Sequence, residues 1–483
     1  MIKNLLSLFC AAAVIASSQA ADDSRPNFVF LLTDDQTTYS LGCYGNEDVQ
    51  TPNIDQLGAD GMIFDKHYNT TAICMASRAN IFTGLFEYRN GCNFEHGHLL
   101  RKKWKKSYPM LLRAAGYKTA MAGKIGLDIA DEPEGKGKLP EDDFDWWGAG
   151  PGQTNYATNK NKSMVKYAEE YPHSTLSYGA FGQDFIKEAA AGDAPFCLSI
   201  SFKAPHKPAT PDPQFDHVYE GKTFKKPENY GREHGEHFSL QSRQGRQFVR
   251  FEEWGYSDRY DEVMATYHQQ IYAVDVAVGM IREAIAEAGV EGDTVIIFTS
   301  DNGFFCGSHG YGSKVLPYEE SARAPMIVYL PGHENSGKGL RTEALTGNVD
   351  FYPTMLELAG LEVAQGIDGK SLLSIYDNPT SSTHEQLPLI NVWGPKAVHS
   401  YGVVTADWKY IYWPYDEGSF EATEELFFIR EDALELRNEL ENPAHSSDLE
   451  KMRQRYDGAV KSWKQKAVPY HNYAPFGDLF QRD

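Results

Sequence analysis

The segment AGVEGDTVIIFTSDNG, residues 288–303, decides the fold class of this chain. It follows a stretch from Tyr260 to Ala288 in which apolar residues recur at helical spacing. A glycine and a short acidic turn come next, and then a run rich in β-branched side chains predicts a buried strand from Thr294. A helix, a turn and a buried strand in this order are typical of an α/β fold with a largely parallel sheet.

Three more apolar runs predict strands of the same sheet. They begin at Asn27 (NFVFLLT), Phe196 (FCLSISF) and Pro325 (PMIVYL). The region from about Gly126 to Tyr260 is rich in Gly, Pro, Asn and His, and its weak periodicity predicts long loops. We therefore expect a large, mostly parallel sheet that is flanked by helices and carries long loops.

The pattern changes after Pro379. Residues 400–415, SYGVVTADWKYIYWPY, alternate in the manner of exposed antiparallel strands, and Leu449–Gln465 has the charged amphipathic pattern of a helix. These features predict a small C-terminal α+β subdomain. The expected divisions are a signal peptide at 1–20, a catalytic α/β domain at 21–379 and the C-terminal subdomain at 380–483.

The N-terminus has the order of a secretory signal peptide. A lysine precedes an apolar run from Leu5 to Ile15, and small residues lead to an expected cleavage after Ala20. Cys10 follows Phe9, where a lipoprotein site favours a small residue, so lipidation is not favoured. No other segment approaches the ~20 apolar residues of a membrane span. We expect an exported protein, periplasmic or secreted, without a membrane span.

Composition and charge exclude several classes of protein. The chain has 483 residues, of which 41% are hydrophobic and 23% charged, as in globular proteins. Its net charge of −21 argues against nucleic-acid binding, which needs a basic surface. Six cysteines are too few for a disulfide scaffold. Without Cys10 an odd number remains, so at least one is unpaired or chemically used, and we expect that one to be Cys74.

Polar residues of a specific kind follow three of the predicted strands. Asp34 and Asp35 follow the first, His206 follows the second, and Asp301 and Asn302 follow the third. In open parallel sheets, ligands bind beyond the carboxyl ends of the strands. A single aspartate there is usually a helix cap or a turn residue. A double Asp together with an Asp-Asn, which offer only oxygen ligands, instead favours a hard cation, Ca²⁺ or Mg²⁺, over zinc.

The segment CMASRANIFTG, residues 74–84, places a cysteine before a plausible first helical turn. A helix N-terminus favours an anion, and Arg78 can hold an oxyanion with two hydrogen bonds. Lys124 in AGKIG and Lys314 in HGYGSK are candidates for the same anion, although a lone lysine is usually a solvated surface charge. Thiolate catalysis by Cys74 would want an adjacent histidine base, and its sequence neighbours supply none.

With these motifs in view, the chain resembles a type I, formylglycine-dependent sulfatase of the alkaline-phosphatase superfamily, in particular a bacterial carbohydrate sulfatase. The segments that carry the resemblance occur in order over most of the chain: LLTDDQ, TPNIDQLGADGMIF, CMASRANIFTG, AGYKTAMAGK, APHKP, SDNG, HGYGSKVLPYEESARAPMIVY and DWKYIYW. The resemblance implies an alkaline-phosphatase-like fold and hydrolysis of sulfate esters on carbohydrates or glycans.

The resemblance also implies a cofactor, a modification and roles for residues. In this family a maturation enzyme oxidises the motif cysteine to formylglycine (3-oxoalanine), whose hydrated gem-diol is the nucleophile. Cys74 would carry that change, and Ser77 would help to specify it. The implied Ca²⁺ ligands are Asp34, Asp35, Asp301, Asn302 and residue 74. The residues implied around the nucleophile and sulfate are Arg78, Lys124, His206 and Lys314, with Asp301 as base and His206 or Lys314 as acid.

Two positions depart from the family pattern. Ala76 replaces the usual proline of the cysteine motif, which is an accepted variant. Gly126 stands where the family's GKxH motif has a histidine that is assigned to expelling sulfate. Either His96 or His98 substitutes for it, or the step runs differently, or the protein is impaired.

Two other functions are compatible with the same motifs. One is a phosphate or phosphonate ester hydrolase of the same superfamily, and the other is a glycan-binding relative without turnover. The lysine pair and PHKP favour sulfate, and the intact cysteine motif favours an enzyme. The basic run RKKWKK from Arg101 is better explained as a solvated face than as a site for a sulfated polymer.

Overall fold

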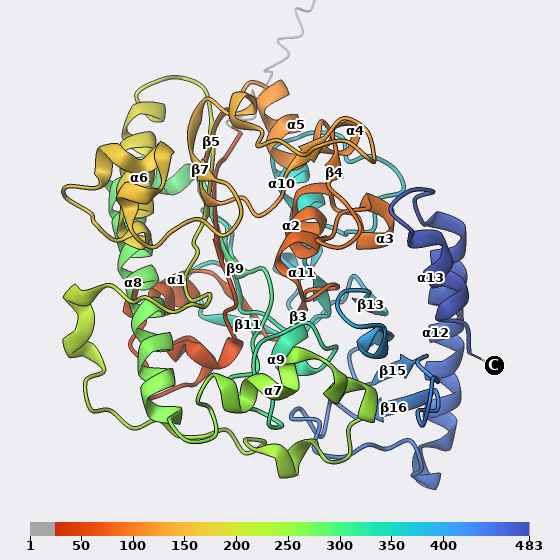
Figure 1. Cartoon of the computed structure of the whole chain (residues 1–483). Coiled ribbons are helices and arrows are strands. Elements are labelled where there is room, and N and C mark those ends of the chain that lie inside the picture. The colour runs from red at the N-terminus through yellow and green to blue at the C-terminus, as the bar shows by residue number, and fades with distance from the viewer. Residues whose placement is uncertain (1–24, 483) are drawn as a thin grey trace, which may run out of the picture.

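The computed structural model describes residues 25–482, so the predicted signal peptide lies outside the described residues. An eight-stranded sheet crosses the middle of the molecule in the order β11-β2-β10-β9-β1-β8-β5-β7 (Figure 1). The neighbours β9, β1, β8, β5 and β7 run parallel, whereas β10 is antiparallel to both of its neighbours. The strands are β1 (Asn27–Thr33), β2 (Met62–Phe64), β5 (Lys118–Lys124), β7 (Trp146–Gly150), β8 (Phe196–Ser201), β9 (Thr294–Ser300), β10 (Met326–Tyr329) and β11 (Leu340–Thr342). The predicted mostly parallel sheet is confirmed.

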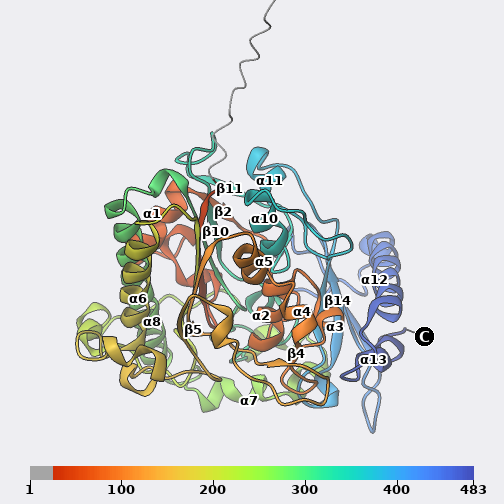
Figure 2. The ribbon, with the colours of Figure 1, turned by 90° about the horizontal axis from the view of Figure 1, so that it is seen from above.

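Helices cover both faces of this sheet, which Figure 2 shows from its edge. Alternate side chains of β1 enter two cores: Val29 and Leu31 pack on one side, and Phe28 and Phe30 on the other. The first core includes α1 (Pro52–Asp60), α6 (Ser174–Ala189) and α8 (Tyr260–Glu287). The second includes α2 (Cys74–Thr83), α5 (Tyr108–Ala114), α10 (Phe351–Leu358) and α11 (Leu373–Asp377).

Helix α6, helix α7 (Arg246–Glu253) and strand β7 lie in the region that the sequence predicted as loops, so that prediction is wrong for all three. Gly179 and Gly182 weaken the helical signal of α6. The structure explains them, because a Cβ at Gly179 would lie 3.3 Å from Ala277 of α8, and one at Gly182 would lie 3.1 Å from Ile281. The two glycines therefore allow α6 and α8 to pack closely.

A second, antiparallel sheet forms the C-terminal unit, at the right of Figure 1. Its elements are β13 (Leu387–Asn391), β14 (Ser400–Val404), β15 (Lys409–Trp413), β16 (Thr423–Phe427), α12 (Ser446–Lys466) and α13 (Tyr473–Leu479). Antiparallel strands and a helix are confirmed, but the strands are buried rather than exposed. Tyr410 packs with α12 residues on one face, whereas Trp413 packs with Tyr318 on the other. The boundary at 379/380 stays a prediction.

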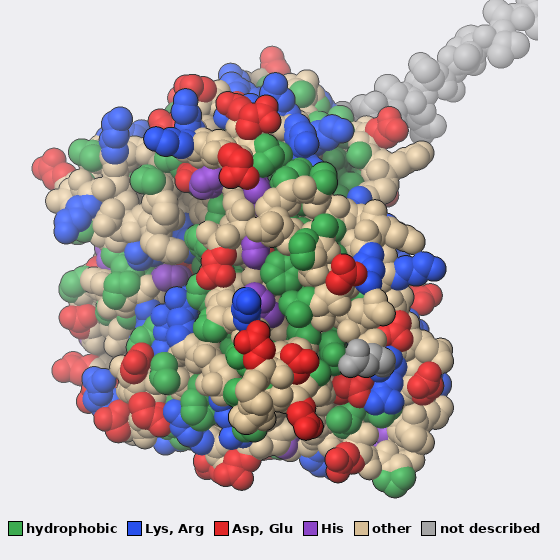
Figure 3. All heavy atoms as spheres, turned by 45° about the vertical axis from the view of Figure 1, so that its right-hand side comes forward, with side chains coloured by type: hydrophobic (Ala, Val, Ile, Leu, Met, Phe, Trp, Pro, Cys, Tyr) green, Lys and Arg blue, Asp and Glu red, His purple; other side chains and the backbone are tan. Residues whose placement is uncertain are grey.

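The structure also bears on the cysteines and on membrane association. All five described cysteines are free: Cys43, Cys74, Cys92, Cys197 and Cys306. Among residues 25–482, no helix combines the length and the apolar character required to cross a membrane. Acidic and basic side chains are interspersed over the face shown in Figure 3.

Candidate functional site

The predicted polar residues meet at the carboxyl ends of four neighbouring parallel strands. Asp34 and Asp35 follow β1, and the backbone N–H of Asp34 donates to the carbonyl of Ala204 after β8 at 3.2 Å. Asp301 follows β9, and its N–H donates to the carbonyl of Thr33 at 3.1 Å. Lys124 is the last residue of β5. Adjacent strands therefore bring together side chains that are up to 267 positions apart in the chain.

The acidic side chains suit a hard cation. One ligand atom from each of Asp34, Asp35, Cys74 and His206 lies within 4.8 Å of the others. The Nδ2 of Asn302 donates to Asp35 Oδ1 at 2.8 Å, while its buried Oδ1 has no hydrogen-bond partner among the described residues. A buried amide oxygen without a partner beside two carboxylates is a donor set suited to Ca²⁺ or Mg²⁺.

Cys74 begins helix α2 and is buried. Its Sγ donates to Asp34 Oδ1 at 3.3 Å and lies 2.7 Å from Lys314 Nζ. Burial, followed by the charge of Asp34, raises the pKa of the thiol to about 12. Cys74 is thus a poor thiolate nucleophile at neutral pH, although it lies at the centre of the cluster.

Three buried cations surround the same point, so the usual role of a lysine as a solvated surface charge does not apply here. Arg78 Nε donates to Asp301 Oδ2 at 2.8 Å, and the guanidinium also contacts the carbonyl of Lys124. Lys124 Nζ pairs with Asp34, and Lys314 Nζ pairs with Asp35. The three side chains are at most 5% exposed.

These charges set the protonation of the acids in opposite directions. Burial alone would raise the pKa of Asp34, but Lys124, His206 and Lys314 hold it well below its usual value. For Asp301, burial and then the charge of Asp34 prevail, and its pKa rises to about 6. Asp301 is therefore the less acidic of these two carboxyl groups.

His206 lies at the edge of this cluster and is partly exposed. Its Nε2 is 3.8 Å from Asp35 Oδ2, and its Nδ1 is buried without a hydrogen-bond partner among the described residues. Burial lowers the pKa of His206 to about 4, so the ring is neutral at pH 7.

Gly126 leaves no room for the histidine that is usual in the family. Its φ is +76°, and a Cβ there would lie 2.5 Å from Arg78 Cδ. His96 bonds to the carbonyl of Val392 at 2.7 Å through Nε2, and its ring packs against the C-terminal unit. The hydrogen-bond partners of the Cys74 thiol among the described residues are Asp34 and Lys314, so neither His96 nor His98 bonds to it.

A cavity of about 790 Å³ opens above the cluster. Asp35, His206 and Lys314 line its floor, and Arg246 and Arg250 of α7 (Arg246–Glu253) line its wall. The sequence interpretation missed both arginines. The signal was their spacing of four residues, which places two cations on one face of a short helix.

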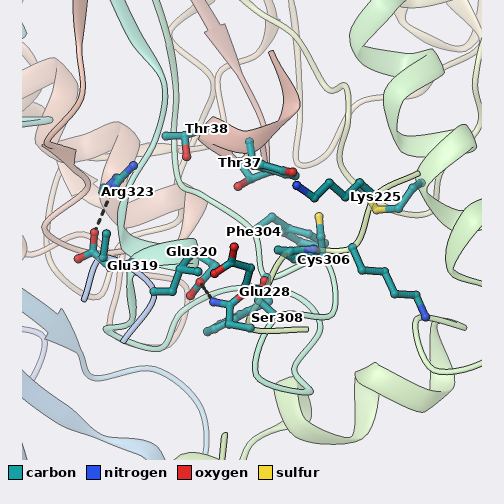
Figure 4. Close-up of a pocket in the computed structure, with 18 of the residues that line it drawn as sticks. Thr37, Thr38, Lys225, Glu228, Phe304, Cys306, Ser308, Glu319, Glu320 and Arg323 are labelled. Carbon is teal, nitrogen blue, oxygen red and sulfur yellow. Dashed lines mark hydrogen bonds and ion pairs between the residues drawn. The ribbon is translucent and has the colours of Figure 1, made fainter. Parts of the chain in front are cut away.

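A second cavity, of about 350 Å³, does not include the metal-type cluster. Figure 4 shows its mixed walls, with the ion pair of Glu319 and Arg323 at one end and Lys225 at the other. Asn229 donates to Glu320 in the same wall. None of the residues predicted for the site line this cavity, so it is not the candidate reaction site.

Comparisons with known proteins place these features in a family. The family model described as Sulfatase matches residues 26–361. A second model, N-sulphoglucosamine sulphohydrolase, C-terminal, matches residues 307–462. Among curated relatives, an N-acetylglucosamine-6-O-sulfatase of Bacteroides thetaiotaomicron is 28% identical and covers 94% of this chain and 89% of its own length. An ulvan-active sulfatase of Formosa agariphila is 25% identical over 80% of this chain and 71% of its own.

Solved structures agree with these matches. One similar structure holds its substrate, D-glucosamine-2-N,6-O-disulfate; it is 25% identical with a TM-score of 0.74 and covers 93% of this chain and 99% of its own. A phosphonate monoester hydrolase of Agrobacterium radiobacter has the same fold, with 20% identity, a TM-score of 0.72 and coverage of 92% and 96%.

Proposed function

This chain belongs to the sulfatase family, whose members hydrolyse sulfate esters, and on that premise we propose that it is an exported carbohydrate sulfatase that uses Ca²⁺ and a formylglycine at position 74. The observation that carries the proposal is the position of Cys74, buried at a helix start between Asp34 and Lys314. A thiol with a raised pKa is unsuited to act directly, which supports a modified residue there.

The oxygen-rich cluster supports the metal. Asp34, Asp35, Asp301, Asn302 and residue 74 would hold the ion. When bound, Ca²⁺ would supply positive charge that withdraws electron density from a sulfate oxygen. Formylglycine, when hydrated, supplies a hydroxyl nucleophile. A maturation enzyme is then a required partner.

The remaining side chains handle charge and protons. Arg78, Lys124 and Lys314 are buried and neutralise the sulfate, because fixed charges act strongly where little solvent reaches them. Asp301 accepts the proton of the attacking hydroxyl at a carboxylate oxygen, the role that the resemblance implies for it. His206 Nε2 or Lys314 Nζ delivers a proton to the departing sugar oxygen. Because Gly126 has no side chain, His206 and Lys314 would also assist the release of sulfate.

The proposal is tested by the product that the mature enzyme releases. The protein is produced with a maturation enzyme, and matched sulfate, phosphate and phosphonate esters of one aryl alcohol and of one sugar are supplied. We expect free sulfate from both sulfate esters, and at least roughly 10²-fold lower turnover of the others. Faster release of phosphate or phosphonate would indicate the other hydrolase of the superfamily. Tight binding of the sugar without turnover would indicate the glycan-binding relative.

A further inference from the structure

Two arginines on the cavity wall have no carboxylate partner among residues 25–482. Arg250 Nη1 donates to Ser313 Oγ at 2.9 Å, and Arg246 is exposed. In the part of the chain that the structure describes, neither forms an ion pair, whereas the nearby Arg232 pairs with Glu252 at 3.0 Å. An unpaired guanidinium pair on a cavity wall is suited to an oxyanion that arrives with a ligand.

Aromatic rings hold both guanidiniums in place. Arg250 lies over Trp254 at 4.3 Å from the ring centroid, and Arg246 lies over Trp393, from the C-terminal unit, at 4.1 Å. Such stacking fixes a planar cation without consuming its hydrogen-bond donors. The two arginines are therefore oriented before a ligand binds, which lowers the entropy cost of binding.

The arrangement carries an electrostatic cost without a ligand. Burial, and then repulsion by Arg246, lowers the pKa of Arg250 to about 10. Asp35 and Glu253 on the cavity lining offset this cost only in part. Asp35 pairs with Lys314, Glu253 forms no ion pair among the described residues, and Glu262 lies 4.0 Å from Arg259. A second anion on the substrate would relieve the repulsion.

The position of the pair relates it to the reaction. Arg250 contacts Ser313, whose neighbour Lys314 contacts Cys74. Burial lowers the pKa of both arginines, whereas the charge of Asp35 on the cavity floor raises it. A group held by the pair would thus belong to the same ligand as a sulfate at Cys74, in a cavity large enough for a sugar unit or two.

We propose that Arg246 and Arg250 form a specificity site for a second anionic group, a sulfate or a carboxylate, on the sugar whose sulfate ester is cleaved. The inference rests on the proposed function. It narrows the substrate class from sulfated carbohydrates to polyanionic ones.

The test compares substrates within each variant. Wild type, Arg246→Gln, Arg250→Gln and the double variant are assayed for sulfate release from four probes. These are 4-nitrophenyl sulfate, a monosulfated hexosamine, its disulfated counterpart and the same monosulfated sugar linked to a uronic acid. Arg243→Gln is the matched control, because this nearby arginine donates to the carbonyls of Gly235 and Glu236 and does not line the cavity.

We expect wild type to prefer at least one dianionic sugar over the monosulfated sugar. Each single variant should lower that ratio of kcat/KM roughly tenfold and the double variant roughly 100-fold, mainly through KM. Arg243→Gln should preserve the ratio. A preference for the disulfated or for the uronate probe identifies the second anion, and either supports the proposal.

Two results would overturn this inference without affecting the proposed function. One is wild-type turnover without preference for a second anion, and the other is equal loss on all probes in the double variant. In both, sulfate is still released, so the proposed function stands. No sulfate from any probe, in mature and folded enzyme, would instead count against the proposed function.

Discussion

The buried cluster at the strand ends and the arginine wall of the cavity differ in how completely their charges are paired. In the cluster, Arg78, Lys124 and Lys314 each contact an acid, and backbone bonds between adjacent strands fix the acids. On the wall, Arg246 and Arg250 contact aromatic rings and one hydroxyl, and no acid within the described part of the chain pairs with them. The cations of the cluster are already paired with acids, and the cluster suits chemistry that is common to a family. The wall is complete only with a ligand and suits selection among substrates.

The strongest way to break the cluster is to remove its central residue. Cys74→Ala should lower sulfate release by more than roughly 10³-fold on every substrate, because the position of the nucleophile is lost. Mass spectrometry of the wild-type peptide that carries residue 74 should show formylglycine. Cys43→Ala, at a half-buried cysteine away from the site, is the control. Fully active protein with only unmodified cysteine would contradict the proposal.

Removing the metal should have a similar effect on activity and a further effect on stability. Without the ion, chelated enzyme should be inactive, and Ca²⁺ at 100 times its Kd should restore about 2.7 kcal/mol of stability as a rise in Tm. Asp34→Asn should abolish both activity and the Ca²⁺-dependent rise in Tm, while the exposed Asp142→Asn should change neither. Full activity after exhaustive chelation, or zinc as the sole bound metal, would show that the site has been misassigned.

His206 lies beside Asp35 of the cluster and also lines the cavity, so its substitution distinguishes the function of one region from that of the other. Since general-acid help is worth roughly 10²–10⁴-fold, His206→Ala should lower kcat on a sugar sulfate by that amount and affect an aryl sulfate less. A bound anion must first raise the pKa of His206 from about 4, so kcat on the sugar should fall as pH rises and the donor form is lost. A melting curve checks folding. Equal losses of kcat on the two substrates would show that His206 is not the general acid, and Lys314 would then be the candidate.

The smallest expected effect tests how tightly the cluster is packed. Gly126→His should not restore a sulfate-contacting histidine, because its Cβ would meet Arg78 at 2.5 Å. We expect a loss of about 2–4 kcal/mol in stability, from backbone strain and overpacking together, seen as a lower Tm. Gly152→His is the matched control, since φ there is also positive, at +55°, but the space is open. A more active and equally stable Gly126→His enzyme would contradict this reading of the packing.

The sequence was sufficient for the parts of the molecule that depend on local pattern. Four strands were predicted from apolar runs, and the polar residues after them converge because neighbouring parallel strands end at one edge. Helix α6 was missed because the benefit of Gly179 and Gly182 appears only when α8 packs against them. The exposure of β14 and β15 was mispredicted because their covering layers come from distant segments. The wall was missed because Arg246 and Trp393 are far apart in sequence.

Helix α7 is joined to the loop that carries Lys314 at two adjacent residues: the N–H of Gly312 donates to the carbonyl of Gln247, and Arg250 donates to Ser313. A ligand that pulls on Arg250 therefore acts on the segment that aligns the ammonium group beside residue 74. Selection among substrates would then show in how fast a bound molecule turns over as well as in how tightly it is held. In a mixture of sulfated sugars, the order of desulfation would then depend on these two contacts between α7 and the loop.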